Sequence, residues 1–362
     1  MKYSDVMVLG SDGYIGWPLT LKLAEEGFNV MGVDAGFKRT HYKEMECQHR
    51  AVDSYSLVPI AGYDERKGCS TSYHRWWCVD ASDEGVLEQA VNSFSPDVVI
   101  HLAEIGTRSF GMSDALAAQL TIHNNTEIIT RLIYALKEQK RATYVVKAGT
   151  LENNRPVKDV CTASVMMSNI MLRVACRAYD LRATEVDMGL VWGLHSADTS
   201  YPLYNTRFDY DASFGPVVHR FMVQALAGGP ITVYGDGTQV IPLIHLTNII
   251  EVFLSAAKMA WHMTKGEHKG IPCCAQMISV AEIADIVNEG LKLMGKKTVP
   301  VHMIVDPRNE GGRIEWPPLP KRAIVRDAIC LTPDTAAEMM AALEPYMVGL
   351  DRRAAFQRDS WR

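Results

Sequence analysis

Features that would point to two common classes of protein are missing from this sequence. It has no long basic run, and 37 Lys and Arg against 42 Asp and Glu give a net charge of -5 at pH 7. A nucleic-acid or anionic-membrane surface is therefore not expected, and any phosphate site must be local. No apolar run reaches the roughly 18 residues that a membrane-spanning helix needs. The chain is expected to have neither nucleic-acid nor membrane partners.

The cysteines lack any pattern typical of a metal site or a disulfide framework. All 8 are scattered along the chain, with no CxxC pair and no Cys/His spacing of the zinc type. Reduced, mostly buried thiols and no bound metal are expected. The N-terminus enters a strand pattern within a few residues and shows no signal-peptide pattern, which favours a cytoplasmic protein.

What is present is a regular alternation of strand and helix patterns in the first half of the chain. A length of 362 residues with 48% hydrophobic content is enough for two lobes or one large α/β domain. Alternation of this kind predicts an α/β fold, a Rossmann-type doubly wound parallel sheet with helices on both faces. Strands are expected at 5–10, 29–34, 96–104, 142–150 and 183–193, and helices at 17–27, 84–94, 124–139 and 162–180.

The pattern changes after Gly193. Residues 194–216 are rich in Tyr, Asp, Ser and Pro, as in a polar loop of the length that tends to be functional. A smaller mixed α/β C-terminal substrate lobe is expected to follow, so the predicted domains are 1–193 and 194–362, with interleaved segments allowed. Its elements are helices at 217–227, 247–262 and 279–294 and a strand at 230–235.

Three glycines spaced GxxGxxG stand between the first expected strand and the first expected helix. Gly10 permits a tight turn, Gly13 lets the backbone approach a pyrophosphate, and Gly16 lets helix and strand pack closely. Asp34, at the end of the second strand, is placed to accept both ribose hydroxyls and to repel a 2′-phosphate. The set predicts NAD rather than NADP, although Arg39 lies close enough to weaken the preference.

Other residues are expected to line the same cofactor site. Asp80 is placed to meet the adenine, and the alternative is that it caps the next helix. The remaining predicted cofactor residues lie in the glycine loop and after neighbouring strands: Tyr14, Ile15, Ala81, Leu102, Ala103, Asn124 and Ala148.

Several stretches carry a resemblance to a known family. "VMVLGSDGYIGWP", "IHLAE", "VVKAGT" and "NTRFDYDASFGPVVHRF" resemble the extended short-chain dehydrogenase/reductase superfamily of NAD-dependent epimerases and dehydratases, and within it the UDP-sulfoquinovose synthase-like proteins. The likeness covers most of residues 5–315. It implies NAD in the amino lobe, a sugar or sugar nucleotide in the carboxyl lobe, and a homodimer formed through a four-helix bundle of helices at about 113–138 and 162–180.

The sequence departs from this family at two places. The family's catalytic Tyr, whose pKa is lowered by a Lys four residues on, is matched by Cys161, and the Lys by Val165. The family's Ser or Thr at the preceding strand end is matched by Thr150. An arginine that clamps the substrate diphosphate is matched by Ile241, whereas Arg308 matches a second family arginine.

The missing pair leaves the acid–base group open. Glu104 and Glu152 follow neighbouring strands at the edge where ligands bind in such folds, so either is a candidate substitute base, and helix capping is the alternative. Cys161 is a candidate nucleophile or acid, or a small buried thiol that fills the space of a tyrosine. The other predicted substrate-binding residues are Arg207, Tyr210 and His245.

Three functions remain open from the sequence. The first is an NAD-containing epimerase/dehydratase-type enzyme that acts on a sugar or sugar-like substrate by an atypical mechanism. The second is a lyase, cyclase or isomerase on the same scaffold without hydride transfer. The third is a non-catalytic subunit that binds NAD or a metabolite.

Overall fold

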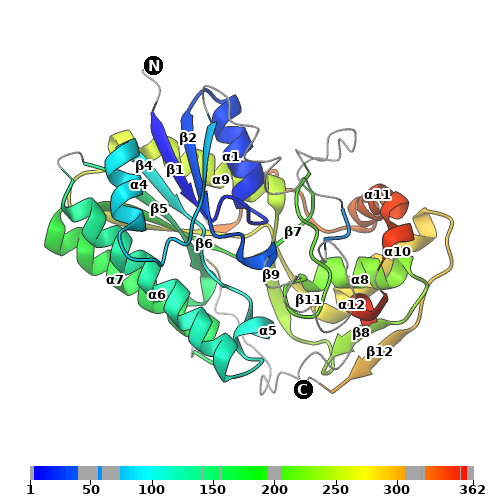
Figure 1. The fold of residues 1–362 in the computed structure, drawn as a ribbon. Helices are drawn as coiled ribbons and strands as arrows, with labels where there is room; N and C mark the ends of the chain where they lie inside the picture. Colours follow the sequence, from blue (N-terminus) through cyan, green and yellow to red (C-terminus); the bar gives the residue numbers. More distant parts are fainter. Residues whose placement is uncertain are drawn as a thin grey trace. The chain divides into compact units, whose positions relative to one another are not determined.

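The contacts of the computed structural model divide the chain into two units (Figure 1). The first comprises Met1–Met45, Ala61–Met188 and Ile249–Pro272, and the second Glu46–Ile60, Gly189–Asn248 and Cys273–Arg362. The chain thus passes between the units several times. The structure describes residues 4–39, 56–58, 74–139, 142–154, 157–194, 205–305, 319, 323–350 and 352–356.

The first unit is built on a seven-stranded sheet with the strand order β10-β6-β5-β4-β1-β2-β3. The pairs β1–β2, β1–β4, β2–β3, β4–β5 and β5–β6 are all parallel. The order reverses direction between β1 and β4, and in folds of this class ligands bind beside such a reversal, at the carboxyl ends of the strands. The strands are β1 (Asp5–Leu9), β2 (Asn29–Asp34), β3 (His74–Cys78), β4 (Val98–His101), β5 (Tyr144–Thr150), β6 (Arg182–Met188) and β10 (His268–Cys273).

Helices cover both faces of this sheet, as Figure 1 shows. Helices α4 (Val86–Phe94), α6 (Ala115–Lys137) and α7 (Val160–Tyr179) lie on one face, and α1 (Gly16–Glu25) and α9 (Leu246–Lys258) lie on the other. Alternate strand residues point to each face, so that one core cluster joins apolar side chains of β1, β2 and β5 to those of α4, α6 and α7. The predicted doubly wound Rossmann-type fold is confirmed.

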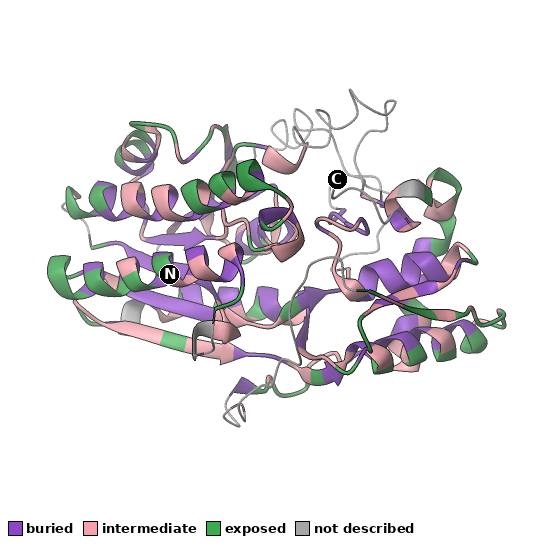
Figure 2. Ribbon diagram, turned by 90° about the horizontal axis from the view of Figure 1, so that it is seen from below, coloured by how far each residue is buried: buried purple, intermediate pink, exposed green. Residues whose placement is uncertain are grey.

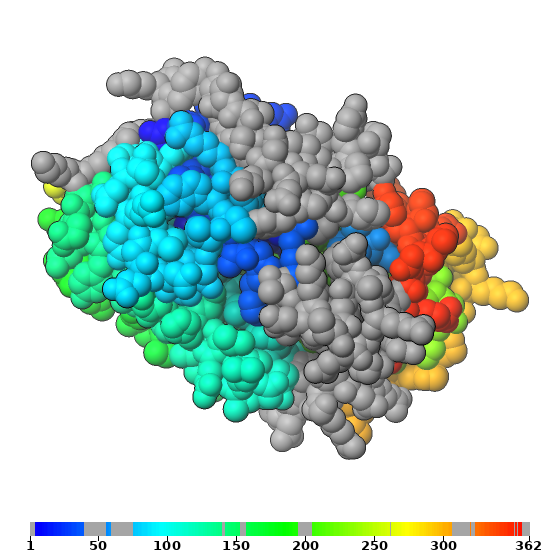
Figure 3. Space-filling model, viewed as in Figure 1, coloured from blue at the N-terminus to red at the C-terminus, as the bar shows by residue number. Residues whose placement is uncertain are grey.

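Burial follows the layers. Figure 2 shows the central strands of the sheet as buried, whereas the edge strand β10 is mostly intermediate and the outer faces of the helices are exposed. In the space-filling view of Figure 3, α4 and α6 form a continuous surface of the first unit. No helix in the described ranges is long and apolar enough to cross a bilayer.

The second unit is mixed α/β. A three-stranded sheet has the order β11-β9-β7, and β12 pairs in parallel with β8. Its core joins helix side chains such as Phe221, Ile283 and Met340. The strands are β7 (Leu190–Trp192), β8 (Ile231–Tyr234), β9 (Val240–His245), β11 (Gln276–Ser279) and β12 (Val301–Ile304), and the helices are α8 (Val217–Leu226), α10 (Val280–Leu293), α11 (Pro333–Leu343) and α12 (Arg352–Phe356).

Two expectations about this half of the chain were wrong. The strand expected at 183–193 is two strands, β6 and β7, which belong to different sheets. The chain passes from one sheet to the other at Gly189, where a Cβ atom would lie 2.6 Å from the Pro242 carbonyl oxygen. The helix expected at 247–262 is α9 followed by a 3₁₀ turn, η3 (Met259–His262).

The polar loop expected at 194–216 is largely interior where it is described. Residues 205–211 are all buried. Some of their polar groups find partners locally, since Arg207 pairs with Asp209 and the Asp211 carboxylate accepts hydrogen bonds from the backbone N–H groups of Ser213 and Phe214. Such hydrogen bonds offset part of the cost of burying a segment that looks hydrophilic in sequence.

The N-terminus of α10 provides a test of local stability. Ser279 accepts a hydrogen bond from the Glu282 backbone N–H, and the Glu282 side chain accepts one from the Ser279 backbone N–H. Loss of such a capping box by Ser279→Ala is expected to lower the free energy of unfolding by about 1 kcal/mol. Thermal unfolding measures this, and Ser279→Asn, which keeps an acceptor at this position, should remain near the wild type. Equal midpoints for the wild type and Ser279→Ala would contradict the assignment.

Candidate active site

The glycine loop joins β1 to α1 and leaves no room for a side chain at Gly10 or Gly16. Gly10 has φ +84°, a left-handed conformation, and a Cβ atom there would lie 2.7 Å from the Ala103 nitrogen. A Cβ atom on Gly16 would lie 1.9 Å from the Gly10 carbonyl oxygen. Glycine is therefore required at both positions, and the loop brings its backbone close to the carboxyl end of β4.

The start of α1 is built to face an anion. The N-cap residue Ile15 supplies no side-chain hydrogen bond to the first turn. The Ser11 hydroxyl in the same loop is buried and has no partner among the described residues. Backbone N–H groups at a helix start favour negative charge, so this loop fits the pyrophosphate of a dinucleotide, with Tyr14 and Ile15 at its rim.

Asp34 is held at the end of β2 by the backbone. One carboxylate oxygen accepts a hydrogen bond from the Asp12 N–H at 2.8 Å and the other from the Gly36 N–H at 2.7 Å. A carboxylate has about four acceptor sites, so both oxygens can still accept ribose hydroxyls. Arg39 forms a two-bond ion pair with Asp12, at 2.6 and 2.9 Å. It therefore lies beside the loop, with its charge offset by Asp12.

The other predicted cofactor residues lie at the same edge of the sheet or just beyond it. Asn124 donates to the Ala103 carbonyl at 2.9 Å and so fixes the loop after β4. Leu102 N–H bonds to the Leu9 carbonyl. Asp80 is exposed and accepts from the backbone N–H and hydroxyl of Ser82 in a local turn, so it does not cap α4, whose N-cap is Gly85, and the adjacent Ala81 is buried.

A buried ion pair lies at the carboxyl ends of β4 and β5. The Lys147 side chain is completely buried, and its Nζ lies 2.6 Å from Glu104 Oε1. The same Nζ donates to the Ala148 carbonyl at 2.8 Å and to Asn169 Oδ1 of α7 at 2.6 Å. Ser168, also on α7, donates to Glu104 Oε1 at 2.8 Å. Burial raises the pKa of Glu104, and the Lys147 ammonium opposes that rise.

A second charged cluster surrounds the start of α7. Arg108 pairs with Glu152 and, at 2.8 Å, with Asp159, which is the N-cap of α7. Arg108 was missed in the sequence because no motif marks it. Glu152 is thus neutralised by an arginine, whereas Thr150, at the end of β5, accepts a hydrogen bond from the Glu152 N–H at 3.2 Å.

The two positions expected to replace the family's Tyr and Lys lie on one buried side of α7. Cys161 is 1% exposed and Val165 is 7% exposed. The Cys161 thiol donates to the Thr107 carbonyl at 3.1 Å, and burial followed by the Asp159 charge raises its pKa to about 12. A thiol so protonated is a poor nucleophile, so the geometry favours the space-filling interpretation.

The predicted substrate residues of the second unit are mostly interior. Arg207 and Tyr210 are buried, and the His245 ring packs edge-on against Trp192 at 4.8 Å. Ile241 lies in β9 opposite Ile278 of β11. Arg308 lies outside the described residues. Within the described ranges, no group of three or more His, Cys, Asp or Glu side chains is placed to hold a metal ion.

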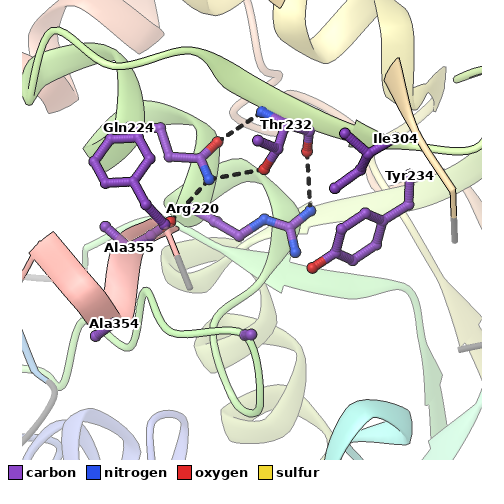
Figure 4. A pocket seen from close by; sticks show the side chains of 9 residues that line it. Arg220, Gln224, Thr232, Tyr234, Ile304, Ala354 and Ala355 are labelled. Atoms are coloured by element: carbon purple, nitrogen blue, oxygen red, sulfur yellow. Dashed lines mark hydrogen bonds between the residues drawn. The ribbon is translucent and has the colours of Figure 1, made fainter. Parts of the chain in front are cut away.

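A small pocket in the second unit is lined by other residues (Figure 4). Gln224 of α8 bonds to both the N–H and the hydroxyl of Thr232 and to the Ala355 carbonyl. The Arg220 guanidinium lies over the Tyr234 ring, 4.3 Å from its centroid. This pocket combines polar side chains with the aromatic rings of Tyr234 and Phe356, and sequence patterns gave no sign of it.

Comparison with known proteins places this arrangement in a family. The sequence model described as "NAD dependent epimerase/dehydratase family" matches residues 6–269. The chain belongs to the NAD-dependent epimerase/dehydratase family. NAD is accordingly its cofactor, and the glycine loop and Asp34 of this structure fit that cofactor.

Two relatives share a low sequence identity with this chain. UDP-sulfoquinovose synthase of Sulfolobus acidocaldarius is 26% identical, over 99% of this chain and 97% of that protein. The chloroplastic UDP-sulfoquinovose synthase of Spinacia oleracea is 28% identical, over 80% of this chain and 65% of that protein. The predicted resemblance is confirmed.

Solved structures show the same fold. UDP-glucuronic acid 4-epimerase of Bacillus cereus, in complex with UDP-glucuronic acid and NAD, has a TM-score of 0.64 at 17% identity and covers 95% of this chain and 99% of that one. The Bordetella bronchiseptica enzyme WbmF, in complex with NADH, has a TM-score of 0.65 at 19% identity, with 97% of each chain covered. At these identities the likeness concerns the fold alone.

The contact between Gly16 and Gly10 predicts the effect of adding one methyl group. In Gly16→Ala the new Cβ would overlap the Gly10 carbonyl, so the loop must open and its pyrophosphate site is lost. NAD affinity, measured by calorimetric titration, is expected to fall by at least about tenfold, which corresponds to about 1.4 kcal/mol.

Gly349→Ala is the matched control, because a Cβ atom at Gly349 meets nothing within 4 Å. It should bind NAD as the wild type does. Unchanged affinity in a folded Gly16→Ala protein would show that the cofactor does not use this loop.

Proposed function

We propose that this chain is a cytoplasmic NAD-dependent enzyme that acts on a sugar nucleotide or a related sugar metabolite without the Tyr and Lys pair of its family. The observation that carries the proposal is the pairing of an intact cofactor loop with an altered α7. Gly10, Gly16 and Asp34 fit a dinucleotide, whereas Cys161 and Val165, which we propose stand in place of the family's pair, are buried on α7.

The chain's own residues define what such a site can do. The glycine loop and the start of α1 bind the pyrophosphate, and Asp34 binds a ribose. Bound NAD supplies a reversible hydride acceptor. Thr150, at the carboxyl end of β5, would orient a substrate hydroxyl. The proton of that hydroxyl must then be accepted by another group at the carboxyl edge of the sheet.

The substrate class is supported by the relatives. Two curated relatives are named UDP-sulfoquinovose synthases, and the Bacillus cereus structure holds UDP-glucuronic acid. Ile241 stands where a diphosphate-binding arginine is expected. We therefore propose that other residues bind the group that anchors this substrate, with Arg207 and Arg308 as candidates.

A non-redox lyase, cyclase or isomerase is the second candidate. Replacement of the proton-shuttle pair by Cys161 and Val165 is the observation that favours it. A hydride-transfer enzyme and a non-redox enzyme differ in whether the nicotinamide changes its oxidation state during turnover.

One experiment tests both candidates. The purified protein is denatured and the released nucleotide is identified, and the native protein is then mixed with UDP-glucose or UDP-glucuronic acid while absorbance of reduced nicotinamide is followed. Bound NAD and a transient reduced nicotinamide are expected. Absence of bound and bindable NAD would refute the proposal, and product formation with no reduced nicotinamide in single turnover would favour the non-redox candidate.

A homodimer is also proposed, through α6 and α7. These helices pack on each other, and their outer sides expose large apolar residues that have no reason to face water in an isolated subunit. On α7, Met167, Ile170 and Val174 are 49%, 54% and 58% exposed and recur at helical spacing. A second copy of the same two helices would complete a four-helix bundle.

A charge on this stripe should therefore block assembly. Ile170→Glu is expected to convert a dimer to a monomer in sedimentation velocity, because an unpaired carboxylate would be buried in the interface. Val348→Glu, at a residue that is 97% exposed in the second unit, is the control and should stay dimeric. A wild type that sediments as a monomer at micromolar concentration would overturn the proposed dimer.

A further inference from the structure

The buried pair of Glu104 and Lys147 is not explained by cofactor binding. Glu104 lies three residues after β4, in the loop that packs against Gly10, so it stands beside the cofactor loop. Its side chain is 7% exposed and that of Lys147 is fully buried. Burial of two charges is costly, and such pairs cluster at functional sites more often than in plain cores.

The hydrogen bonds show which of the two side chains can contact a bound molecule. An ammonium has three donors, and the Lys147 ammonium meets three acceptors, on Glu104, Ala148 and Asn169. Lys147 therefore has no donor left for a ligand. In the described part of the chain, the two hydrogen bonds that reach the Glu104 side chain, from Lys147 and Ser168, both end on Oε1. Oε2 is the oxygen that can serve a bound molecule.

The position of this carboxyl group is the one that acid–base chemistry needs. The single Ser168 hydroxyl proton is shared between Glu104 Oε1 and the Val165 carbonyl, so Glu104 contacts α7 one turn after the site proposed for the missing lysine. The thiol at Cys161 is buried, and Glu152 is paired with Arg108. Of the acidic candidates described at this sheet edge, Glu104 is the one anchored through a single oxygen by an uncharged hydroxyl and a buried ammonium.

We propose that Glu104 is the acid–base catalyst of this chain, and that Lys147 and Ser168 position it; the inference rests on the proposed function. When a substrate carbinol is oxidised, its hydroxyl proton passes to Glu104 Oε2 and the O–H electron pair becomes the second bond of the carbonyl. The electron pair of the C–H bond leaves with hydrogen as hydride to bound NAD. Return of the hydride and the proton restores a carbinol, so the cycle balances without another reactant.

The charged surroundings give a direction for the pH dependence. Lys147 lowers the pKa of Glu104, and burial and the Glu185 carboxylate of β6 raise it, with a net rise. His101 of β4 is buried, and burial followed by Lys147 lowers its pKa to about 3, so it stays neutral. A base with a raised pKa is lost as the pH falls through that pKa, so turnover should decline on the acid side at a pH above the ordinary glutamate range.

The test combines variants with a readout other than turnover. Glu104→Gln is expected to lower kcat by about 10²–10⁴-fold while NAD binding, measured by calorimetry, stays unchanged, and Glu104→Asp should recover part of the loss. Glu289→Gln, on a surface glutamate paired with Lys292, is the matched control. Infrared titration of the NAD-bound protein should show a protonated carboxyl band that is present in the wild type and absent in Glu104→Gln.

A further variant covers the case in which Glu104→Gln fails to fold. Ser168→Ala removes one hydrogen bond to the carboxylate, which should raise the pKa of Glu104 and move the acid limb of the pH profile and the infrared titration to higher pH. A titration that does not move, or a folded Glu104→Gln with wild-type kcat, overturns the inference and leaves the proposed function intact. A wild type that neither binds NAD nor reduces it overturns the proposed function instead.

Discussion

The ammonium of Lys147 constrains the arrangement at the carboxyl edge of the first sheet. An uncompensated charge at its depth would cost several kcal/mol, so three acceptors must be brought to it. They come from the loop after β4, from β5 and from α7. The ammonium therefore fixes the distance between the sheet and α7 and the direction of Glu104. The glycine loop lies against the same β4 loop, so the cofactor site and the acid–base site share one wall.

The parts of this site that could be predicted from the sequence are those that depend on local backbone geometry. The glycine spacing and the acid at the end of the next strand fix a loop whose conformation is set by sterics within about 30 residues, and Gly10, Gly16 and Asp34 lie where such a loop places them. The alternation of strands and helices likewise sets the layers. Each of these signals depends on the periodicity of residue types or on residues close together in the chain, and both can be seen in a single sequence.

What could not be predicted depends on partners far apart in the chain. Nothing near Arg108 in sequence indicates Glu152 or Asp159, and nothing near Lys147 indicates that its side chain points into the interior. The break at Gly189 was missed because an apolar run that crosses from one sheet to another looks like one long strand. The burial of segment 205–211 could not be predicted because hydrophobicity does not show the ion pairs and hydrogen bonds that form within a polar loop.

The proposed replacement of the Tyr and Lys pair agrees with the proposed carboxyl acid–base catalyst on grounds of pKa. A tyrosine, with an ordinary pKa of about 10, must be lowered to work near neutral pH, and a nearby ammonium does this. A glutamate has an ordinary pKa of about 4.3, and this pKa must rise, which burial can achieve. The Glu104 side chain is 7% exposed, and its burial raises the pKa against the opposing effect of the Lys147 ammonium. Burial therefore shifts the pKa of Glu104 in the direction that the proposed acid–base role requires.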